Sequence, residues 1–508
     1  MAGKVAACAE TRLGPRPPHR HAGLEVGVDS PFALRYRRIT RDFAGGTGWR
    51  RVAPVERCRS DGSAAREPRV PEIRAFRALR FDPEKVGDLN CVICPPYDVI
   101  GPEMHQTLLA RHPANVVRLD LPEVQAGEEP DDRYRRAARM LSTWRMDGTL
   151  RKDGQSSIYV YEQTYRVPGS DQIRTQRGFF GRLYLEDLVP GSGVLPHERT
   201  LSAPKEDRYK LLRATAVNTS PVVGLYADSS GRSVQALAAI TSRRPDIDVA
   251  DDDHVRHRMW AVPEDGSDAR FVKSLIEVAG QEPITIADGH HRYETALRYR
   301  DERRANKTGE TDPPADYVMM LFLETTKQRL TVLPTYRVAR SLGDEGVRDL
   351  LDHAAWLFEV KPVESRAELE AAFASVDVLG GRGRFGLWTR NGGAILTARR
   401  SDFAMSLREG GAALHRLDVT LLQVALDRLC GIDASAIAAG RLAYSKSVAE
   451  ALDWVDAAKD GADAAFLLDP TPVADIAAVA ADGDVMPQKS TYFYPKALTG
   501  LIINPHEW

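Results

Sequence analysis

The chain has 508 residues, more than one ordinary hydrophobic core supports, so its length indicates two to four domains. Its composition is 43% hydrophobic and 28% charged, and its net charge is −2. Nucleic acids and anionic membranes favour a basic face, so this charge makes a nucleic-acid partner unexpected. No apolar run reaches the ~18 residues of a membrane span, so no membrane contact is expected. Five cysteines do not make a disulfide framework in so long a chain, which indicates a reducing, cytoplasmic compartment.

Residues 1–70 are rich in Arg, Pro and Gly and show no sustained hydrophobic period. We expect this segment to be a disordered extension. It lacks the apolar core of a signal peptide and contains acidic residues, which favours an accessory tail or an upstream start-site extension over a targeting sequence. The folded protein is expected to begin near Pro71.

Residues 71–170 are predicted to form an N-terminal α/β region. The expected elements are a strand at Cys91–Cys94, a helix at 102–112, a strand at 115–121 and a helix at 131–146. Cys91 and Cys94 lack a second CxxC to complete a zinc site, so we interpret them as small core residues. Two prolines then present Tyr97 and Asp98, either into a cleft or within a rigid turn, and the residues alone favour the turn.

Residues 171–340 are predicted to form a second, central region. A strand is expected at 157–166, before this region, and strands at 178–185 and 222–226 lie within it, with a polar cluster, Leu195 to Thr200, between the last two. In this cluster His197 and Glu198 are candidate groups for proton transfer. Lys205 and Arg208 follow at the start of a helix, where a solvated helix end is the alternative to a binding face.

The most informative stretch is Pro283 to Leu297. Alternating apolar residues give way to helical spacing after Gly289, so a strand, a tight turn and a helix are predicted. The helix N-terminus would bind an anion, and Asp288, His290, His291 and Arg292 would surround it with an acid/base group, proton carriers and a phosphate clamp. An N-cap at Asp288 within a polar surface loop explains the same residues equally well.

Residues 341–508 are predicted to be a C-terminal α/β region. It follows strands expected at Tyr317–Leu323 and ending at Arg337, and it includes an amphipathic helix at 414–429. Near the chain end, Lys489, Ser490 and Thr491 precede an aromatic run. This pattern suits a loop that folds back over a ligand, and a C-terminal strand packed on the core explains the aromatic residues as well.

Together, these clusters resemble the bacterial and archaeal family called domain of unknown function one thousand and fifteen. The resemblance rests on Pro95 to Ile100, Leu195 to Arg208, Asp288 to Leu297 and Met486 to Lys496, and it extends from about Pro71 to Pro505. Tyr336 stands where the family pattern has His, which weakens any catalytic role at that position.

The order of Pro-His-Glu before Asp-Gly-His-x-Arg at a helix start is also similar to the ParB/sulfiredoxin superfamily, which includes free serine kinases. This resemblance implies a mixed α/β fold, with a ParB-like central domain between two flanking α/β regions. It implies that Gly289 and Arg292 hold nucleotide phosphates, and that Glu198 activates the substrate hydroxyl.

We therefore hypothesise phosphoryl transfer from ATP or ADP, or from CTP, to the hydroxyl of a small molecule such as free L-serine. Asp288 would bind Mg²⁺ or orient the nucleophile, and His290 and His291 would bind phosphate or carry protons beside Glu198 and His197. The remaining residues expected to contact the nucleotide are Lys205, Arg208, Lys489, Ser490 and Thr491. Two alternatives are a nucleotide-operated switch that contacts DNA or a protein, and a phosphatase acting on a phosphorylated metabolite. The sequence carries no signal of an oligomeric state.

Overall fold

The computed structural model describes residues 70–189, 191–198, 203–306, 313–375, 380, 383–407 and 410–508. The predicted extension, except Val70, therefore lies outside the described residues, as do Arg199 and Thr200 of the Leu195 to Thr200 cluster. No helix in the described part of the chain is long and apolar enough to cross a membrane.

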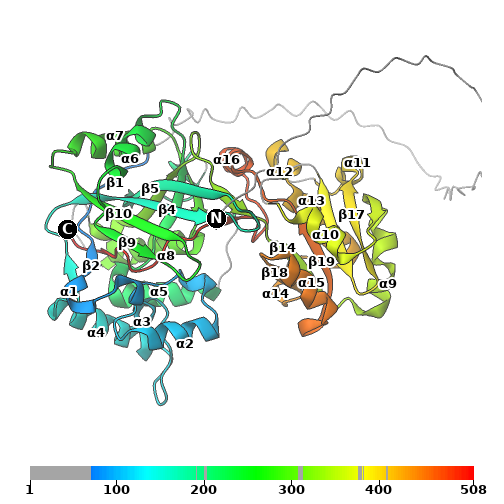
Figure 1. Cartoon of the computed structure of the whole chain (residues 1–508), viewed down its shortest axis with the longest axis horizontal. Coiled ribbons are helices and arrows are strands. Elements are labelled where there is room, and N and C mark those ends of the chain that lie inside the picture. The colour runs from blue at the N-terminus through cyan, green and yellow to red at the C-terminus, as the bar shows by residue number, and fades with distance from the viewer. Residues whose placement is uncertain are drawn as a thin grey trace, which may run out of the picture. The chain divides into compact units, whose positions relative to one another are not determined.

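The site is built on a mixed nine-stranded sheet (Figure 1). Eight strands follow the order β6-β11-β8-β12-β5-β4-β10-β9, and β1 pairs with β5. The bounds are β1 Ile73–Arg74, β4 Ser157–Arg166, β5 Ile173–Tyr184, β6 Val194–Leu195, β8 Val222–Tyr226, β9 Ile247–Ala250, β10 Arg256–Pro263, β11 Ile284–Asp288 and β12 Tyr317–Glu324. β11 is parallel to β6 and antiparallel to β8, whereas β12 is parallel to β8 and antiparallel to β5. The predicted mixed α/β class is confirmed.

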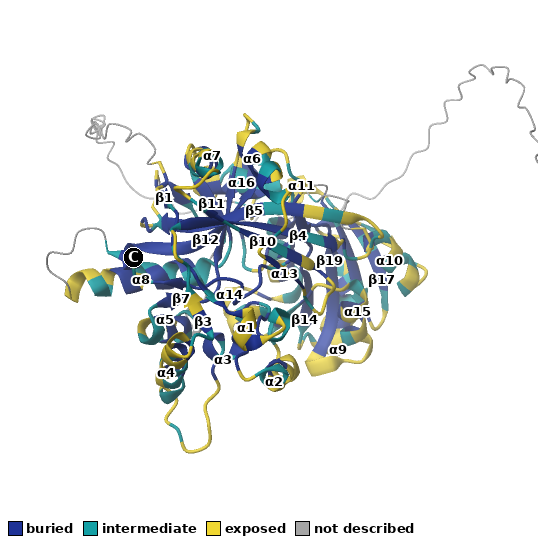
Figure 2. Ribbon diagram, turned by 60° about the vertical axis from the view of Figure 1, so that its left-hand side comes forward, coloured by how far each residue is buried: buried dark blue, intermediate teal, exposed yellow. Residues whose placement is uncertain are grey.

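Both faces of this sheet are buried, as the dark central strands in Figure 2 show. In β12, which is buried throughout, Val318, Met320 and Phe322 belong to one apolar cluster. The alternate residues Met319, Leu321 and Leu323 belong to a second cluster on the opposite face. Side chains alternate between the faces of a strand, so a continuous apolar run marks a strand covered on both sides.

Helices α6 Arg232–Thr241 and α7 Ala269–Ala279 share one apolar cluster with the sheet, together with residues of α8 His290–Asn306. The other cluster includes residues of the N-terminal helices. Their bounds are α1 Pro83–Val86, α2 Pro102–Arg111, α3 Val117–Asp120, α4 Asp132–Met146 and α5 Ala203–Thr215, with short 3-10 turns η1 Leu89–Cys91 and η2 Tyr97–Val99. The helices predicted at 102–112 and 131–146 are confirmed.

Two strand predictions in the N-terminal region are wrong. At Cys91–Cys94, the Asp88 carboxylate accepts the Asn90 N–H at 3.0 Å and starts the 3-10 turn η1, and only Cys94 makes an isolated bridge. At 115–121 the chain forms α3, because Asn115 Oδ1 accepts the Val117 N–H at 3.0 Å. Short polar side chains that bond nearby backbone favour such helix starts over strands.

A second, six-stranded antiparallel sheet has the order β15-β17-β16-β19-β14-β18. Its strands are β14 Tyr336–Arg340, β15 Phe358–Pro362, β16 Arg384–Thr389, β17 Gly392–Ala398, β18 Leu442–Ser445 and β19 Ala462–Leu468. The turn η3 Pro314–Asp316 directly precedes β12 of the nine-stranded sheet. The helices and turns of the part with the six-stranded sheet are α9 Gly343–Ala354, α10 Arg366–Phe373, α11 Arg400–Phe403, α12 Ala412–Arg416, α13 Asp418–Cys430, α14 Ala434–Ala438, α15 Val448–Asp456, η4 Lys459–Gly461 and α16 Val473–Ala481. The single helix predicted at 414–429 is divided, because Leu417 between α12 and α13 is extended.

The boundary predicted between residues 170 and 171 falls in the turn that joins β4 to β5, which pair with each other along their length. Strands of the predicted N-terminal and central regions therefore share one sheet. The division of residues 71–508 into separate domains stays a prediction.

The C-terminal segment returns to the nine-stranded sheet and is held there by Arg182 of β5. Three small pairings involve β2 Leu79–Phe81 with β3 Leu150–Lys152, β7 Val217–Asn218 with β21 Asn504–Pro505, and β13 Thr331–Leu333 with β20 Tyr492–Tyr494. Arg182 is only 1% exposed and donates to Asn504 Oδ1 at 2.7 Å, Pro505 O at 2.6 Å and Glu507 O at 2.9 Å. One buried guanidinium thus satisfies three acceptors of the last residues.

Replacing this guanidinium should weaken the whole fold. We expect Arg182→Leu to lower the free energy of unfolding by about 3 kcal/mol, because it leaves buried acceptors without donors. Arg145→Leu is the matched control, because Arg145 is an exposed partner of Glu507 at 2.8 Å, and should cost less than about 1 kcal/mol. Urea unfolding of both variants measures the difference, and equal losses would contradict the assignment.

Candidate functional site

The centre of the site is the junction of β11 and α8. Gly289 has φ +86°, a left-handed conformation that lets the strand turn into the helix without a Cβ penalty. A Cβ at this position would lie 2.9 Å from Arg292 Nε. The glycine therefore allows both the turn and the close approach of Arg292, as the predicted strand, turn and helix require.

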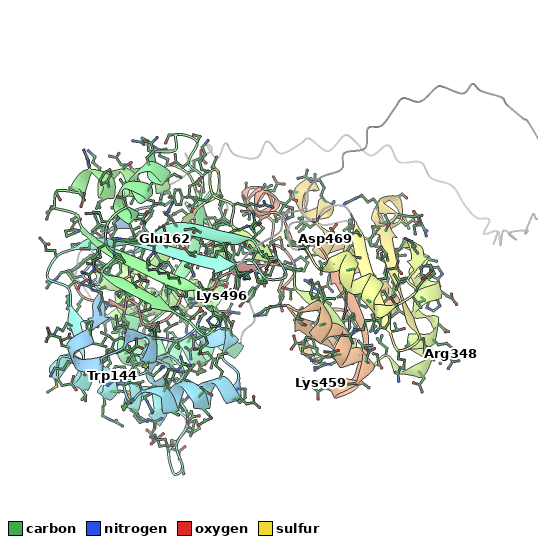
Figure 3. The ribbon with its side chains drawn as sticks, viewed as in Figure 1. Trp144, Glu162, Arg348, Lys459, Asp469 and Lys496 are labelled. Atoms are coloured by element: carbon green, nitrogen blue, oxygen red, sulfur yellow. The ribbon has the colours of Figure 1, made fainter. Side chains whose placement is uncertain are left out.

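Asp288 binds two cations. One carboxylate oxygen pairs with Arg292 Nη2 at 2.5 Å and the other with Lys496 Nζ, which is labelled in Figure 3. Burial alone would raise the pKa of Asp288, but the charges of Lys496 and Arg292 outweigh burial and hold that pKa well below its usual value. Asp288 is thus ionised and ties α8 to the segment that follows β20.

His197 and Glu198 lie next to this junction, because β6 pairs with β11 and the chain continues alongside it. The buried His197 ring contacts Ile286 O through Nδ1 and Thr491 Oγ1 through Nε2, the latter at 3.0 Å. The His197 backbone also joins the C-terminal loop, since its carbonyl accepts the Met486 N–H at 2.8 Å. His197 therefore fixes the position of Glu198 between two distant segments of the chain.

Glu198 is the carboxylate of the site whose pKa is raised. Its Oε1 accepts the Lys489 N–H at 2.6 Å, and its Oε2 lies 4.0 Å from His197 Nε2. Burial raises the pKa of Glu198 to about 7, although the Lys489 N–H and the charges of Lys489 and Arg337 oppose this shift. Near neutral pH the carboxylate can therefore both accept and release a proton.

The three histidines of the site, His197, His290 and His291, all have lowered pKa values. Burial lowers the pKa of His197 to about 4, and burial together with His197 lowers that of His290 well below its usual value. The two rings lie edge to face with centroids 4.6 Å apart, and His290 Nε2 accepts the His197 N–H at 3.3 Å. Burial also lowers the pKa of His291. The first two rings are therefore neutral at pH 7.

The six-stranded sheet contributes cations that sequence reasoning did not single out. Arg337 of β14 is 3% exposed and donates to Lys489 O at 3.1 Å, which supports the turn that holds Glu198. Lys446, directly after β18, places its Nζ 3.6 Å from the ring centroid of Tyr492. Lys496 ends the Met486 to Lys496 cluster and Arg337 follows Tyr336, but neither was predicted to contact a ligand, and Lys446 has no local sequence signal. Tyr336, the departure from the family pattern, is buried in the core.

The structure gathers most of the predicted site residues but gives some of them other partners. Arg208 is buried and paired with Asp207 at 2.5 Å and Asp120 at 3.5 Å, so its charge is already balanced. Lys205 pairs with Glu294. Ser490 is buried and donates to Pro487 O at 2.5 Å, which shapes the loop. Thr491 contacts the site through its hydroxyl, which lies 3.0 Å from His197 Nε2.

Tyr97 and Asp98, whose role the sequence left open, also lie near the cluster. The Tyr97 ring centroid is 4.2 Å from the Arg208 guanidinium, and burial raises the pKa of Tyr97 to about 12. Asp98 is exposed, and its charge acts on Arg292, His291 and Lys446. The double-proline turn thus directs Tyr97 and Asp98 toward the predicted site.

The predicted metal ligand does not fit a resident metal ion. Both oxygens of Asp288 are bound by cations, and no group of three or more His, Cys, Asp or Glu side chains among the described residues could hold a metal. Mg²⁺ that accompanies nucleotide phosphates belongs to the substrate. The residues of the site itself favour an anion.

The protein has a mixed α/β fold, and its charged site lies at the N-terminus of helix α8. These two features make it a candidate anion-binding protein. The chain belongs to the family described as "Protein of unknown function (DUF1015)", whose model matches residues 73–425. A search of curated proteins finds no match.

Among solved structures the chain is distantly similar to "Free serine kinase in complex with AMP", with 13% identity and a TM-score of 0.30 over 59% of this chain and 83% of that one. It is also similar to "SbnI with C-terminal truncation from Staphylococcus aureus", with 9% identity and a TM-score of 0.30 over 60% and 82%. A conserved hypothetical protein from Pyrococcus furiosus shows 13% identity and a TM-score of 0.29 over 59% and 87%. Such low scores carry no chemical conclusion.

Gly289→Ala should damage the site through a clash rather than through backbone strain alone. The new Cβ would displace Arg292, in addition to a left-handed strain of about 1–2 kcal/mol. Gly231→Ala is the matched control, because Gly231 also has φ +73° but nothing lies within 4 Å of its added Cβ. We expect backbone strain to destabilise both variants, Gly289→Ala more because of the added clash, and anion affinity to be lost only in Gly289→Ala, measured by calorimetry with ATP. Equal affinity in both would contradict this.

Proposed function

We propose that this protein transfers a phosphoryl group from a nucleotide to the hydroxyl of a small molecule, with Glu198 as the general base. The observation that carries the proposal is the placement of Glu198, whose Oε1 accepts the Lys489 N–H at 2.6 Å and whose Oε2 lies 4.0 Å from His197 Nε2, while burial raises its pKa to about 7 against the charges of Lys489 and Arg337. Phosphoryl transfer requires mostly positioning and charge neutralisation, and a base that accepts the hydroxyl proton near neutral pH completes these requirements.

The geometry around Glu198 supports this role. The Lys489 N–H fixes Oε1 at 2.6 Å, so the carboxylate has a defined orientation. The buried His197 has a pKa of about 4 and both its ring nitrogens engaged, so it acts as a neutral positioning residue. The acceptor proton is thus taken by Glu198, with no need for proton transfer through His197.

The start of α8 supports the nucleotide side of the proposal. First-turn N–H groups have no acceptor within their own helix, and the helix dipole places partial positive charge there. Gly289 allows a close approach to these groups, while Arg292 and Lys496 lie beside them on Asp288. Phosphates of ATP or ADP, or of CTP, would bind at this end of the helix.

The acceptor to test first is free L-serine, which the sequence resemblance implies. A turnover panel with each nucleotide, with and without L-serine, separates the candidate activities. Release of inorganic phosphate without an acceptor would favour a phosphatase, and nucleotide binding without turnover would favour a conformational switch. Either result would overturn the kinase proposal.

Removing the base should abolish catalysis and preserve nucleotide binding. We expect Glu198→Gln to lower kcat by about 10²–10⁴-fold, because general bases contribute rate enhancements of this size. In the wild-type protein kcat should rise with pH through about 7, since the base acts when deprotonated. Glu206→Gln, an exposed position paired with Arg298, is the control and should leave the profile unchanged. A full-activity Glu198→Gln enzyme would refute the assignment.

The same substitution should change the pH dependence of stability. The pKa of Glu198 is raised in the folded state, so its stabilising protonation is complete below about 4.5 and lost as the pH rises through about 7. Glutamine keeps the acceptor for Lys489 without the buried charge. Thermal unfolding should therefore show Glu198→Gln more stable than wild type at pH 8 and similar to it at pH 4. A pH-independent difference would exclude this explanation.

A further inference from the structure

Within the part of the chain that the structure describes, Lys446 has no carboxylate partner, unlike Arg292, Lys496 and Lys205. Arg292 and Lys496 are paired with Asp288, and Lys205 with Glu294. Among the described residues, Lys446 makes no ion pair or hydrogen bond, and its Nζ instead lies 3.6 Å from the centroid of the Tyr492 ring. An ammonium over one aromatic face keeps N–H donors for a further acceptor. Lys446 is also solvent-exposed, so a ligand can reach it.

The strand register places Lys446 on the Glu198 side of the site. β14 and β18 are antiparallel neighbours, with Arg337 opposite Tyr444, two residues before Lys446. Arg337 donates to Lys489 O at 3.1 Å, and the Lys489 N–H binds Glu198 at 2.6 Å. The edge of the six-stranded sheet that supports the general base therefore also carries Lys446.

The charges that face Lys446 leave its positive charge incompletely balanced. Partial burial, with the charges of Lys496 and Lys489, lowers the pKa of Lys446 to about 8, although Asp98 and Asp288 oppose this shift. Asp288 is already paired with both Arg292 and Lys496, and Asp98 also acts on Arg292. A ligand that brings its own negative charge to this position would restore the balance.

We propose that Lys446 is a specificity-determining residue that binds a carboxylate of the acceptor while the acceptor hydroxyl faces Glu198. This inference rests on the proposed phosphotransferase function and narrows its substrates to hydroxy acids, including hydroxy amino acids. The nucleotide phosphates are assigned to the start of α8. The acceptor carboxylate would therefore be bound by Lys446, which follows β18 of the six-stranded sheet. The Tyr492 ring, whose centroid lies 3.6 Å from Lys446 Nζ, holds the ammonium in place.

The test compares acceptors that share a hydroxyl and differ in charge. With L-serine, Lys446→Met should raise the acceptor KM about tenfold or more, the effect of losing a charge-assisted hydrogen bond, and leave kcat and the nucleotide KM within about twofold. With L-serinamide, which lacks the carboxylate, the same variant should behave like wild type. Lys446→Arg should restore most of the L-serine affinity. Lys459→Met is the matched control, because Lys459 also contacts an aromatic ring, Trp454, with Nζ 5.1 Å from its centroid (Figure 3).

Three outcomes would overturn the inference. Equal effects on L-serine and L-serinamide would indicate a purely structural role, a raised nucleotide KM would assign Lys446 to phosphate, and an unchanged L-serine KM would remove it from the site. Calorimetric binding of L-serine and of D-glycerate to wild type and Lys446→Met makes the test independent of turnover. Absence of transfer with either acceptor contradicts the proposed kinase, whereas absence of Lys446-dependent carboxylate binding contradicts the inference by itself.

Discussion

The ion-pair bridge at Asp288 is the interaction on which the arrangement of the site depends. One carboxylate at the end of β11 holds Arg292 of the following helix and Lys496 of the C-terminal segment. A buried charge is costly unless it is paired, so these three side chains stabilise one another only when strand, helix and returning segment are all in place. The bridge thereby makes the geometry of the site a property of the completed fold.

The electrostatics of the site follow from which groups obtain such partners. Asp288 has two cations and remains ionised, whereas Glu198 has a single backbone donor at 2.6 Å and a pKa raised by burial to about 7. Two carboxylates in one cluster thus have pKa values moved in opposite directions, an arrangement that separates a fixed charge from a proton acceptor. The neutral His197 and His290 fill the space between them without adding charge.

The two sheets contribute different parts of this cluster. The nine-stranded sheet positions the start of α8, the proposed anion site, and Glu198, the proposed base, and the six-stranded sheet supplies Arg337, which donates to Lys489 O, and Lys446, which contacts the Tyr492 ring. The loop from Met486 to Lys496 joins both contributions, because its backbone contacts His197, Glu198 and Arg337. This arrangement is consistent with the proposal that the nucleotide binds at the start of α8 and the acceptor carboxylate binds at Lys446.

The sequence by itself determined the local elements whose signals are short-ranged. The apolar run of β12, the turn at Gly289 and the cluster around Glu198 could all be identified from neighbouring residues. Local reasoning failed at 115–121, where the Asn115 side chain starts a helix in a strand-like sequence. It gave no signal for Lys446, and it did not indicate that Arg208 pairs with Asp120 and Asp207. Partners far apart in the chain decide burial and charge pairing, so only the tertiary structure fixed which cations are paired with carboxylates and which carboxylate has a raised pKa.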